Sequence, residues 1–195
     1  MELFNYFDKA EFAERFLSGE VSMNSLASYR DLERAEEMGA ARFDREEGTA
    51  NTNDGVVTSH KLFGNLIRVL CCSTILNEQL KAEFGEFVVR ITDANAFGLL
   101  IAGVVEHASF TLIGMQYQLV SYGDEPTCIS DYVFVESQLF TKPTRYSYQH
   151  EYRYAFVERD ELQKWEGQPA KLENPPRREL RLPAEELSGL LERMF

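Results

Sequence analysis

Residues that cross-link chains or bind metals are scarce in this sequence, which has three cysteines and three histidines among 195 residues. Cys71 and Cys72 are adjacent and Cys128 is the third, so the sequence predicts neither a disulfide framework nor a paired-cysteine metal knuckle. The histidines have no zinc-like spacing and no supporting cysteine or carboxylate pattern. We therefore expect a reduced protein without a metal.

Long apolar runs are also missing, and so is an excess of basic charge. The longest apolar candidate, Ala94 to Val105, is interrupted by one asparagine and two glycines, and residues 1–7 lack the basic start of a signal peptide. The 20 basic and 32 acidic residues give a net charge of −12, which repels phosphate backbones. We expect a cytoplasmic protein that binds neither membranes nor, non-specifically, nucleic acids.

Three common catalytic and nucleotide-binding motifs are absent: the G-x-S-x-G elbow, the Walker loop and the Rossmann glycine fingerprint. Gly39, Gly48 and Gly55 are too widely spaced to surround one phosphate together. These absences argue against the corresponding enzyme classes.

The residues that are present predict a folded protein of one domain. Hydrophobic residues make up 44% of the chain and charged residues 27%, the usual balance of a globular protein. The length matches one domain, which we place at residues 1–195. Strand patterns do not alternate regularly with long helices, so we expect an α+β fold with a mixed or mainly antiparallel sheet flanked by helices.

Local patterns predict where the elements lie. Strands are expected at 3–7, 65–76, 87–91, 109–122 (or a hairpin broken near Gly114), 146–157 and 180–182. Asp8 and Glu11 form a capping box for the first helix, with Phe7 and Phe12 as its staple. Further helices are expected at 77–84, at 93–105 and from Pro183 to the end of the chain.

Burial in a single core is predicted for eight apolar side chains: Phe12, Phe16, Val69, Leu70, Val88, Ile91, Phe156 and Leu190. The C-terminal helix would contribute to it a stripe made by Leu187, Leu190, Leu191 and Met194. Residues 48–59, by contrast, have the composition of turns and are predicted to form a mobile loop.

The segment from Lys142 to Val157 carries the most chemical information. In an extended strand Gln149, Glu151 and Arg153 share one face, and the other face is aromatic. A polar trio beside an aromatic wall can bind a small ligand, with the carboxylate accepting ribose hydrogen bonds or stabilising positive charge. The alternative is a half-exposed strand in which Glu151 and Arg153 are solvated.

Gln149-x-Glu151 resembles the Q-x-E element of ADP-ribosyltransferases, and Ser73-Thr74 resembles their Ser-Thr-Ser element, with Ile75 as a departure. The first strand, LFNYF, also lacks the early Arg or His of that family. The resemblance implies that the protein cleaves the nicotinamide–ribose bond of NAD and transfers ADP-ribose to an acceptor. Glu151 would stabilise the transition state, Gln149 would face the acceptor, and Ser73 or Thr74 would position the cleft.

Other residues are candidates for contacts with the nucleotide. Tyr29 can stack on a base, and Arg30 and Arg153 are candidates for the pyrophosphate because guanidinium groups bind phosphates in a forked geometry. The alternative for Tyr29 and Arg30 is an arginine packed over a tyrosine on the surface.

The whole chain is also similar to an uncharacterised group of bacterial and phage proteins, through the segments SLASYRDLE (25–33), RFDREEG (42–48) and Lys142 with RYSYQHEYR (145–153). That similarity places the protein in phage–host conflict and implies no chemistry. Two alternatives to the NAD enzyme therefore stay open: an acidic, non-enzymatic inhibitor of a host protein, and an enzyme or binder that acts on another nucleotide.

Overall fold

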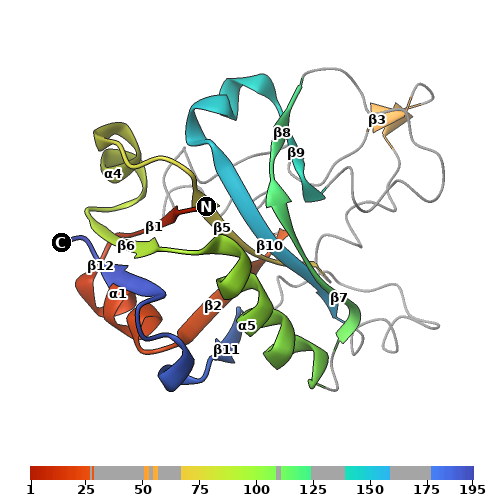
Figure 1. Ribbon diagram of the computed structural model, residues 1–195. Coiled ribbons are helices and arrows are strands. Elements are labelled where there is room, and N and C mark those ends of the chain that lie inside the picture. The colour runs from red at the N-terminus through yellow and green to blue at the C-terminus, as the bar shows by residue number, and fades with distance from the viewer. Residues whose placement is uncertain are drawn as a thin grey trace.

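A computed structural model describes residues 1–26, 28, 51–52, 55–56, 67–108, 111–123, 139–158 and 177–195 of the protein. An eight-stranded antiparallel sheet with helices packed against it confirms the predicted α+β class (Figure 1). Its strands are β1 (Leu3–Phe7), β2 (Glu20–Ser25), β5 (Ile67–Ser73), β6 (Phe87–Ile91), β7 (Thr111–Leu119), β10 (Glu151–Glu158), β11 (Arg178–Arg181) and β12 (Leu191–Arg193). The helices described are α1 (Ala10–Leu17), α4 (Glu78–Phe84) and α5 (Ala94–Glu106).

Two short strand pairs lie outside this sheet. β3 (Asn51–Thr52) pairs with β4 (Gly55–Val56) antiparallel, within the predicted loop at 48–59. β8 (Ser121–Tyr122) pairs with β9 (Thr141–Lys142) in parallel. The rest of the 48–59 segment lies outside the described residues, as do Tyr29 and Arg30, so the predictions on them stay predictions.

The central strand β5 has a different set of neighbours on each edge. One edge pairs with β10 along seven residue pairs, from Ile67 to Ser73, and β10 pairs in turn with β7. The other edge is divided: β2 pairs with Arg68 and Val69, whereas β1 pairs with Ser73. β1 and β2 therefore diverge along this edge, and the middle of β5, Leu70 to Cys72, faces the gap between them (Figure 1).

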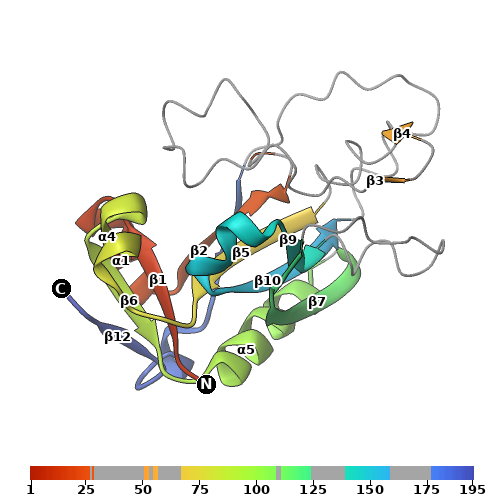
Figure 2. The same ribbon diagram turned by 90° about the horizontal axis from the view of Figure 1, so that it is seen from above.

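Apolar side chains cover the sheet on both faces, which explains why β5 and β10 are so hydrophobic. Successive side chains of β10 alternate between two clusters: Tyr152, Tyr154 and Phe156 pack with α1 and α5, whereas Ala155 and Val157 pack with Leu26, Leu139 and Phe140. Figure 2 shows α5 on one side of the sheet and the turn before β10 on the other. The single predicted core is therefore two layers, and Phe12 is only half-buried, while the other seven residues predicted to be buried are so.

Close packing between α5 and β7 depends on a glycine. A Cβ atom at Gly98 would lie 2.9 Å from the ring of Tyr117, a distance that side chains do not tolerate. Asp93 caps the helix as predicted, since its carboxylate accepts hydrogen bonds from the backbone N–H groups of Asn95 and Ala96. β7 continues through Gly114 without a break, which decides between the two sequence-based alternatives in favour of a strand.

The start of the first helix differs from the prediction. Lys9 occupies the N-cap position and makes no side-chain cap hydrogen bond, so Asp8 and Glu11 do not form a capping box. Because the helix begins one residue later than the pattern suggested, Asp8 precedes the N-cap position. Phe7 stacks on Phe16, with ring centroids 5.4 Å apart, one helical turn beyond the predicted partner Phe12.

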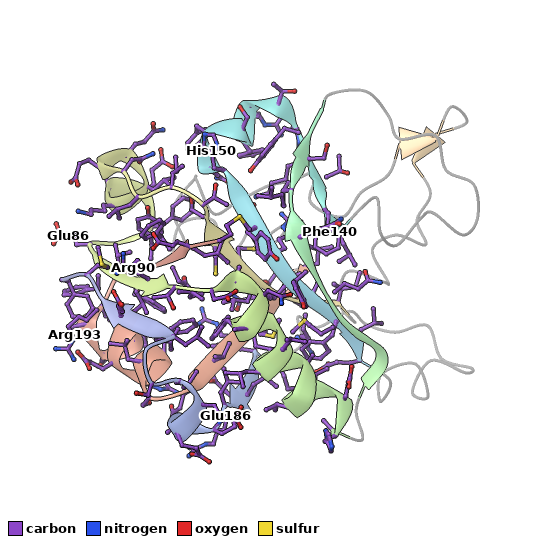
Figure 3. All side chains as sticks on the ribbon, in the orientation of Figure 1. Glu86, Arg90, Phe140, His150, Glu186 and Arg193 are labelled. Atoms are coloured by element: carbon purple, nitrogen blue, oxygen red, sulfur yellow. The ribbon has the colours of Figure 1, made fainter. Side chains whose placement is uncertain are left out.

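The predicted C-terminal helix is wrong. After Pro183 only a single 3₁₀ turn forms, Ala184–Glu186, and the chain then adds β12 to the edge of the sheet beside β6. Gly189 has a φ of 77°, a left-handed conformation that ends helical structure and suits glycine. Leu187 and Leu190 are buried as the pattern required, but Met194 is exposed. Arg90 of β6 and Arg193 of β12 mark this edge in Figure 3.

The segment 146–157 is also only partly a strand. Pro143 precedes a 3₁₀ helix, Thr144–Gln149, and His150 has a φ of 44°, so β10 begins at Glu151. Figure 3 labels His150 at this junction. The predicted alternation of faces holds from Glu151 onward, but Gln149 belongs to the preceding turn.

Among the described residues, no helix is long and apolar enough to cross a membrane. The prediction of a single domain over residues 1–195 and that of a cytoplasmic location stay predictions.

Candidate functional site

A cleft of about 250 Å³ lies where β1 and β2 diverge from β5. Its floor is the part of the β5 edge that lies between β1 and β2, and its walls come from both diverging strands, from α1 and from α4. One end is closed by polar side chains that precede or begin β10. The side chains used below are Phe4 and Tyr6 of β1, Phe12 of α1, Ser22 of β2, Cys71 and Ser73 of β5, Phe84 of α4, and Lys142, Gln149 and Glu151.

The aromatic part of the cleft comes from elements that are far apart in the sequence. Phe4 and Tyr6 alternate along β1, and Phe12 and Phe84 come from the two helices. All four rings are half-buried, which leaves aromatic surface available to a ligand. Planar rings of this kind offer stacking surfaces for a nucleobase or a nicotinamide ring.

Glu151 lies at the polar end of the cleft and is held by two cations. Arg153 donates from Nε to Glu151 Oε1 at 2.6 Å and from Nη2 to Oε2 at 3.4 Å. Lys142 Nζ lies 2.8 Å from Glu151 Oε2. The side chain of Glu151 is 5% exposed and that of Arg153 is 1% exposed, so the alternative of two solvated side chains is wrong.

Burial and ion pairing act in opposite directions on this carboxyl group. Burial by itself would raise the pKa of Glu151, but the charges of Arg153 and Lys142 outweigh it and hold the pKa well below its usual range. Glu151 is therefore a carboxylate at every physiological pH. It can stabilise positive charge or accept hydrogen bonds from hydroxyl groups, but it cannot donate a proton.

Arg153 is a fixed part of the site. Its Nη1 donates to the backbone carbonyl of Leu139 at 2.7 Å, so both ends of the guanidinium group are bound. The sequence-based assignment of Arg153 to a pyrophosphate is not supported by this position, because its buried guanidinium is directed at Glu151 and at the backbone. Its role here is to orient the Glu151 carboxylate.

Gln149 lines the cleft, and its side chain is already hydrogen-bonded. Its Oε1 accepts a hydrogen bond from Lys142 Nζ at 3.1 Å, and its side chain also hydrogen-bonds Tyr148. Gln149 is 5% exposed. The amide therefore fixes the position of Lys142, and contact with an acceptor would require these bonds to be exchanged.

Ser73 and Thr74 connect β5 to the turn that holds Gln149. Ser73 Oγ donates to the backbone carbonyl of Gln149 at 2.8 Å and accepts from the N–H of Ile75 at 3.2 Å. Thr74 donates twice to the carbonyl of His150, from its N–H at 2.9 Å and from its hydroxyl at 3.3 Å. Both residues therefore fix the backbone of the turn that holds Gln149.

Cys71 extends the cluster on the floor of the cleft, where it hydrogen-bonds Glu151. Burial, with the nearby carboxylate as a further contribution, raises the pKa of the thiol well above its usual range. A protonated thiol is a poor nucleophile, so Cys71 is not suited to nucleophilic catalysis.

Among the residues that the structure describes, one hydroxyl in the cleft has no hydrogen-bonding partner. Ser22 Oγ is buried and unpaired, and Ser22 lines the cleft from β2. A buried hydroxyl without a partner is costly unless another group supplies the hydrogen bond.

The structure thus brings together Gln149, Glu151, Arg153, Ser73 and Thr74, which the sequence picked out separately. It adds Lys142, whose contact with Glu151 the sequence pattern did not reveal. The two residues are separated by a 3₁₀ turn rather than by strand spacing, so neither helical nor strand periodicity could link them. Their proximity in the segment 142–157 was the one available signal.

No group of three or more histidine, cysteine or acidic side chains suited to a metal occurs within the described part of the chain. Comparisons with protein-family models, curated proteins and solved structures find no match to this chain. The resemblances to ADP-ribosyltransferases and to the bacterial and phage group therefore rest on the sequence motifs given above.

Proposed function

We propose that the protein is an ADP-ribosyltransferase-like enzyme that binds NAD in the cleft between β1 and β2. The observation that supports this proposal is the convergence of Gln149, Glu151 and Ser73 at one end of a single cleft. Ser73 and Gln149 belong to different motifs, 76 positions apart in the sequence. The Ser73 hydroxyl nevertheless donates a hydrogen bond to the Gln149 carbonyl. Aromatic side chains line the same cleft.

The proposed reaction requires a carboxylate near the ribose. When the bond between ribose C1′ and the nicotinamide nitrogen breaks, its electron pair goes to the nitrogen and positive charge develops on the sugar. An oxygen of the acceptor then bonds to C1′ and loses its proton to water. Glu151, which stays ionised, stabilises the positive charge without taking part in the bond changes.

The size of the cleft limits which part of NAD it can enclose. Small-molecule sites usually have volumes of about 300–1,000 Å³, and this cleft has about 250 Å³. We infer that it encloses the nicotinamide nucleoside, and that the rest of the dinucleotide lies over the mouth of the cleft.

A second candidate function is binding of another nucleotide without cleavage. It is favoured by the two cations that hold Glu151, because they offset the negative charge that an oxocarbenium ion would need. In that case the cleft still binds a ring and an anionic group, but Glu151 has no catalytic role.

The test is release of nicotinamide from NAD by the wild-type protein, measured by chromatography with protein and nucleic-acid acceptors supplied. The enzyme proposal expects release that is inhibited by nicotinamide. Protection of the protein against thermal unfolding by AMP or ADP, without any release from NAD, would favour the second candidate.

A further inference from the structure

We propose that Lys142 selects a phosphate-bearing ligand by exchanging its partner: when the ligand binds, a phosphate oxygen takes the place of Glu151 beside the Lys142 ammonium group. This inference deepens the proposed function and rests on it. Lys142 acts here as a ligand-binding residue that also controls how much of the negative charge of Glu151 faces the ligand.

The ammonium group of Lys142 contacts several side chains at the polar end of the cleft. It lies 2.8 Å from Glu151 Oε2 and donates to Gln149 Oε1 at 3.1 Å. It also lies 5.2 Å from the centre of the Tyr146 ring, within cation–π range. Lys142 is thus in contact with both residues of the Q-x-E element at the wall of the cleft.

The geometry allows one of the two cations to leave without isolating the carboxylate. Arg153 keeps two hydrogen bonds to Glu151 and is anchored at Leu139, so it cannot follow a ligand. Lys142 differs from it in being on the two-residue strand β9 and in having a side chain that is 10% exposed. If Lys142 turns toward a ligand, Glu151 stays buried but paired, which avoids the large cost of an unpaired buried charge.

The exchange favours an anionic ligand because it replaces one ion pair with another. A phosphate oxygen offers the ammonium group the same charge-assisted hydrogen bond that the carboxylate provided. A neutral nucleoside offers none, and it must bind beside an intact Lys142–Glu151 pair. The phosphate also leaves Glu151 with a single neutralising cation, so the carboxylate attracts a developing positive charge more strongly.

Two probes that differ by one phosphate test the exchange: nicotinamide mononucleotide and nicotinamide riboside, each titrated by calorimetry. We expect the wild type to bind the phosphorylated probe about 10- to 100-fold more tightly, the range of one hydrogen bond to a charged group. Lys142→Met should bring the two affinities within about threefold of each other. Lys142→Gln provides a second neutral variant, and Lys142→Arg should retain the preference.

Lys81→Met is the matched control, because Lys81 lies on α4 and pairs with Glu78 at the surface. It should leave the preference unchanged. Three outcomes would overturn the role of Lys142. The wild type could bind both probes equally or neither of them, or the preference for the phosphorylated probe could survive in both neutral variants. Nicotinamide release from NAD is measured on the same samples. Loss of the preference in the Lys142 variants, with no release by the wild type, would support the Lys142 exchange and overturn the proposed catalysis.

Discussion

Two buried carboxylates at opposite ends of β10 are each paired with two cations, but only one of them lines the cleft. Glu151, the first residue of the strand, is held by Arg153 and Lys142. Glu158, the last residue, accepts from Arg68 Nη2 at 2.7 Å and from Arg178 Nε at 2.5 Å. Both are buried, yet Glu151 lines the cleft and Glu158 does not.

This comparison teaches that a buried, doubly paired glutamate is not in itself a sign of a catalytic site. Burial by itself would raise the pKa of Glu158, but its two arginines outweigh burial and lower the pKa. The net shift therefore has the same direction as that of Glu151. What separates the two residues is access to a ligand. Glu158 therefore provides an internal control for every experiment on Glu151.

The largest difference is expected in catalysis. Glu151→Gln keeps the shape of the side chain but removes its charge, and it should lower nicotinamide release by about 100- to 1,000-fold, as expected when a preorganised electrostatic contact is lost. Glu158→Gln should stay within about threefold of the wild type, because Glu158 does not line the cleft. Rates are compared at a temperature where both variants are folded, and equal losses in the two variants would contradict a special role for Glu151.

The next largest effect concerns stability, and here both variants should show a loss. Removing one member of a buried ion pair costs about 3–5 kcal/mol, because the remaining charges stay buried. We expect Glu151→Gln to lie toward the upper end of this range in urea unfolding, because the side chains of Arg153 and Lys142 are only 1% and 10% exposed. Glu158→Gln should lie toward the lower end, because the side chain of Arg178 is 36% exposed and water can solvate it. A nearly unperturbed fold in Glu151→Gln would contradict the burial of its ion pairs.

The pH dependence of stability gives a third, smaller effect. The pKa values of both carboxyl groups are lowered in the folded protein, relative to about 4.3 in an unfolded chain. Their stabilisation is therefore complete above that value and is lost as the pH falls below it. Urea midpoints of the wild type should drop between about pH 5 and pH 3, and each glutamine variant should show a shallower slope. Parallel slopes would mean that the substituted group does not contribute.

The smallest effect is expected at an ion pair on the surface. Lys81 and Glu78 are 2.8 Å apart, one turn apart on α4, and the side chain of Glu78 is 87% exposed. Lys81→Met should change the free energy of unfolding by no more than about 1 kcal/mol. A loss comparable to that of Glu158→Gln would remove the distinction between buried and exposed pairs on which the comparison depends.

The local patterns that proved reliable are those in which one short segment decides the structure. The alternation in residues 151–157 predicted which side chains of β10 share a face. The apolar run at 65–76 predicted a strand, which the structure has at Ile67–Ser73. Asp93 caps α5 through its own neighbours. Such features depend on side-chain periodicity and on hydrogen bonds within a few residues, so the sequence contains them.

Long-range contacts decided the rest. The apolar stripe near the end of the chain fits a helix, but pairing with β6 and the turn at Gly189 make it a strand. The sequence by itself determined the α+β class and the residues of the Q-x-E element. Only the tertiary structure decided that Lys142 reaches Glu151 and that β1 and β2 separate to form a cleft, because both depend on strand pairing and packing between residues distant along the chain.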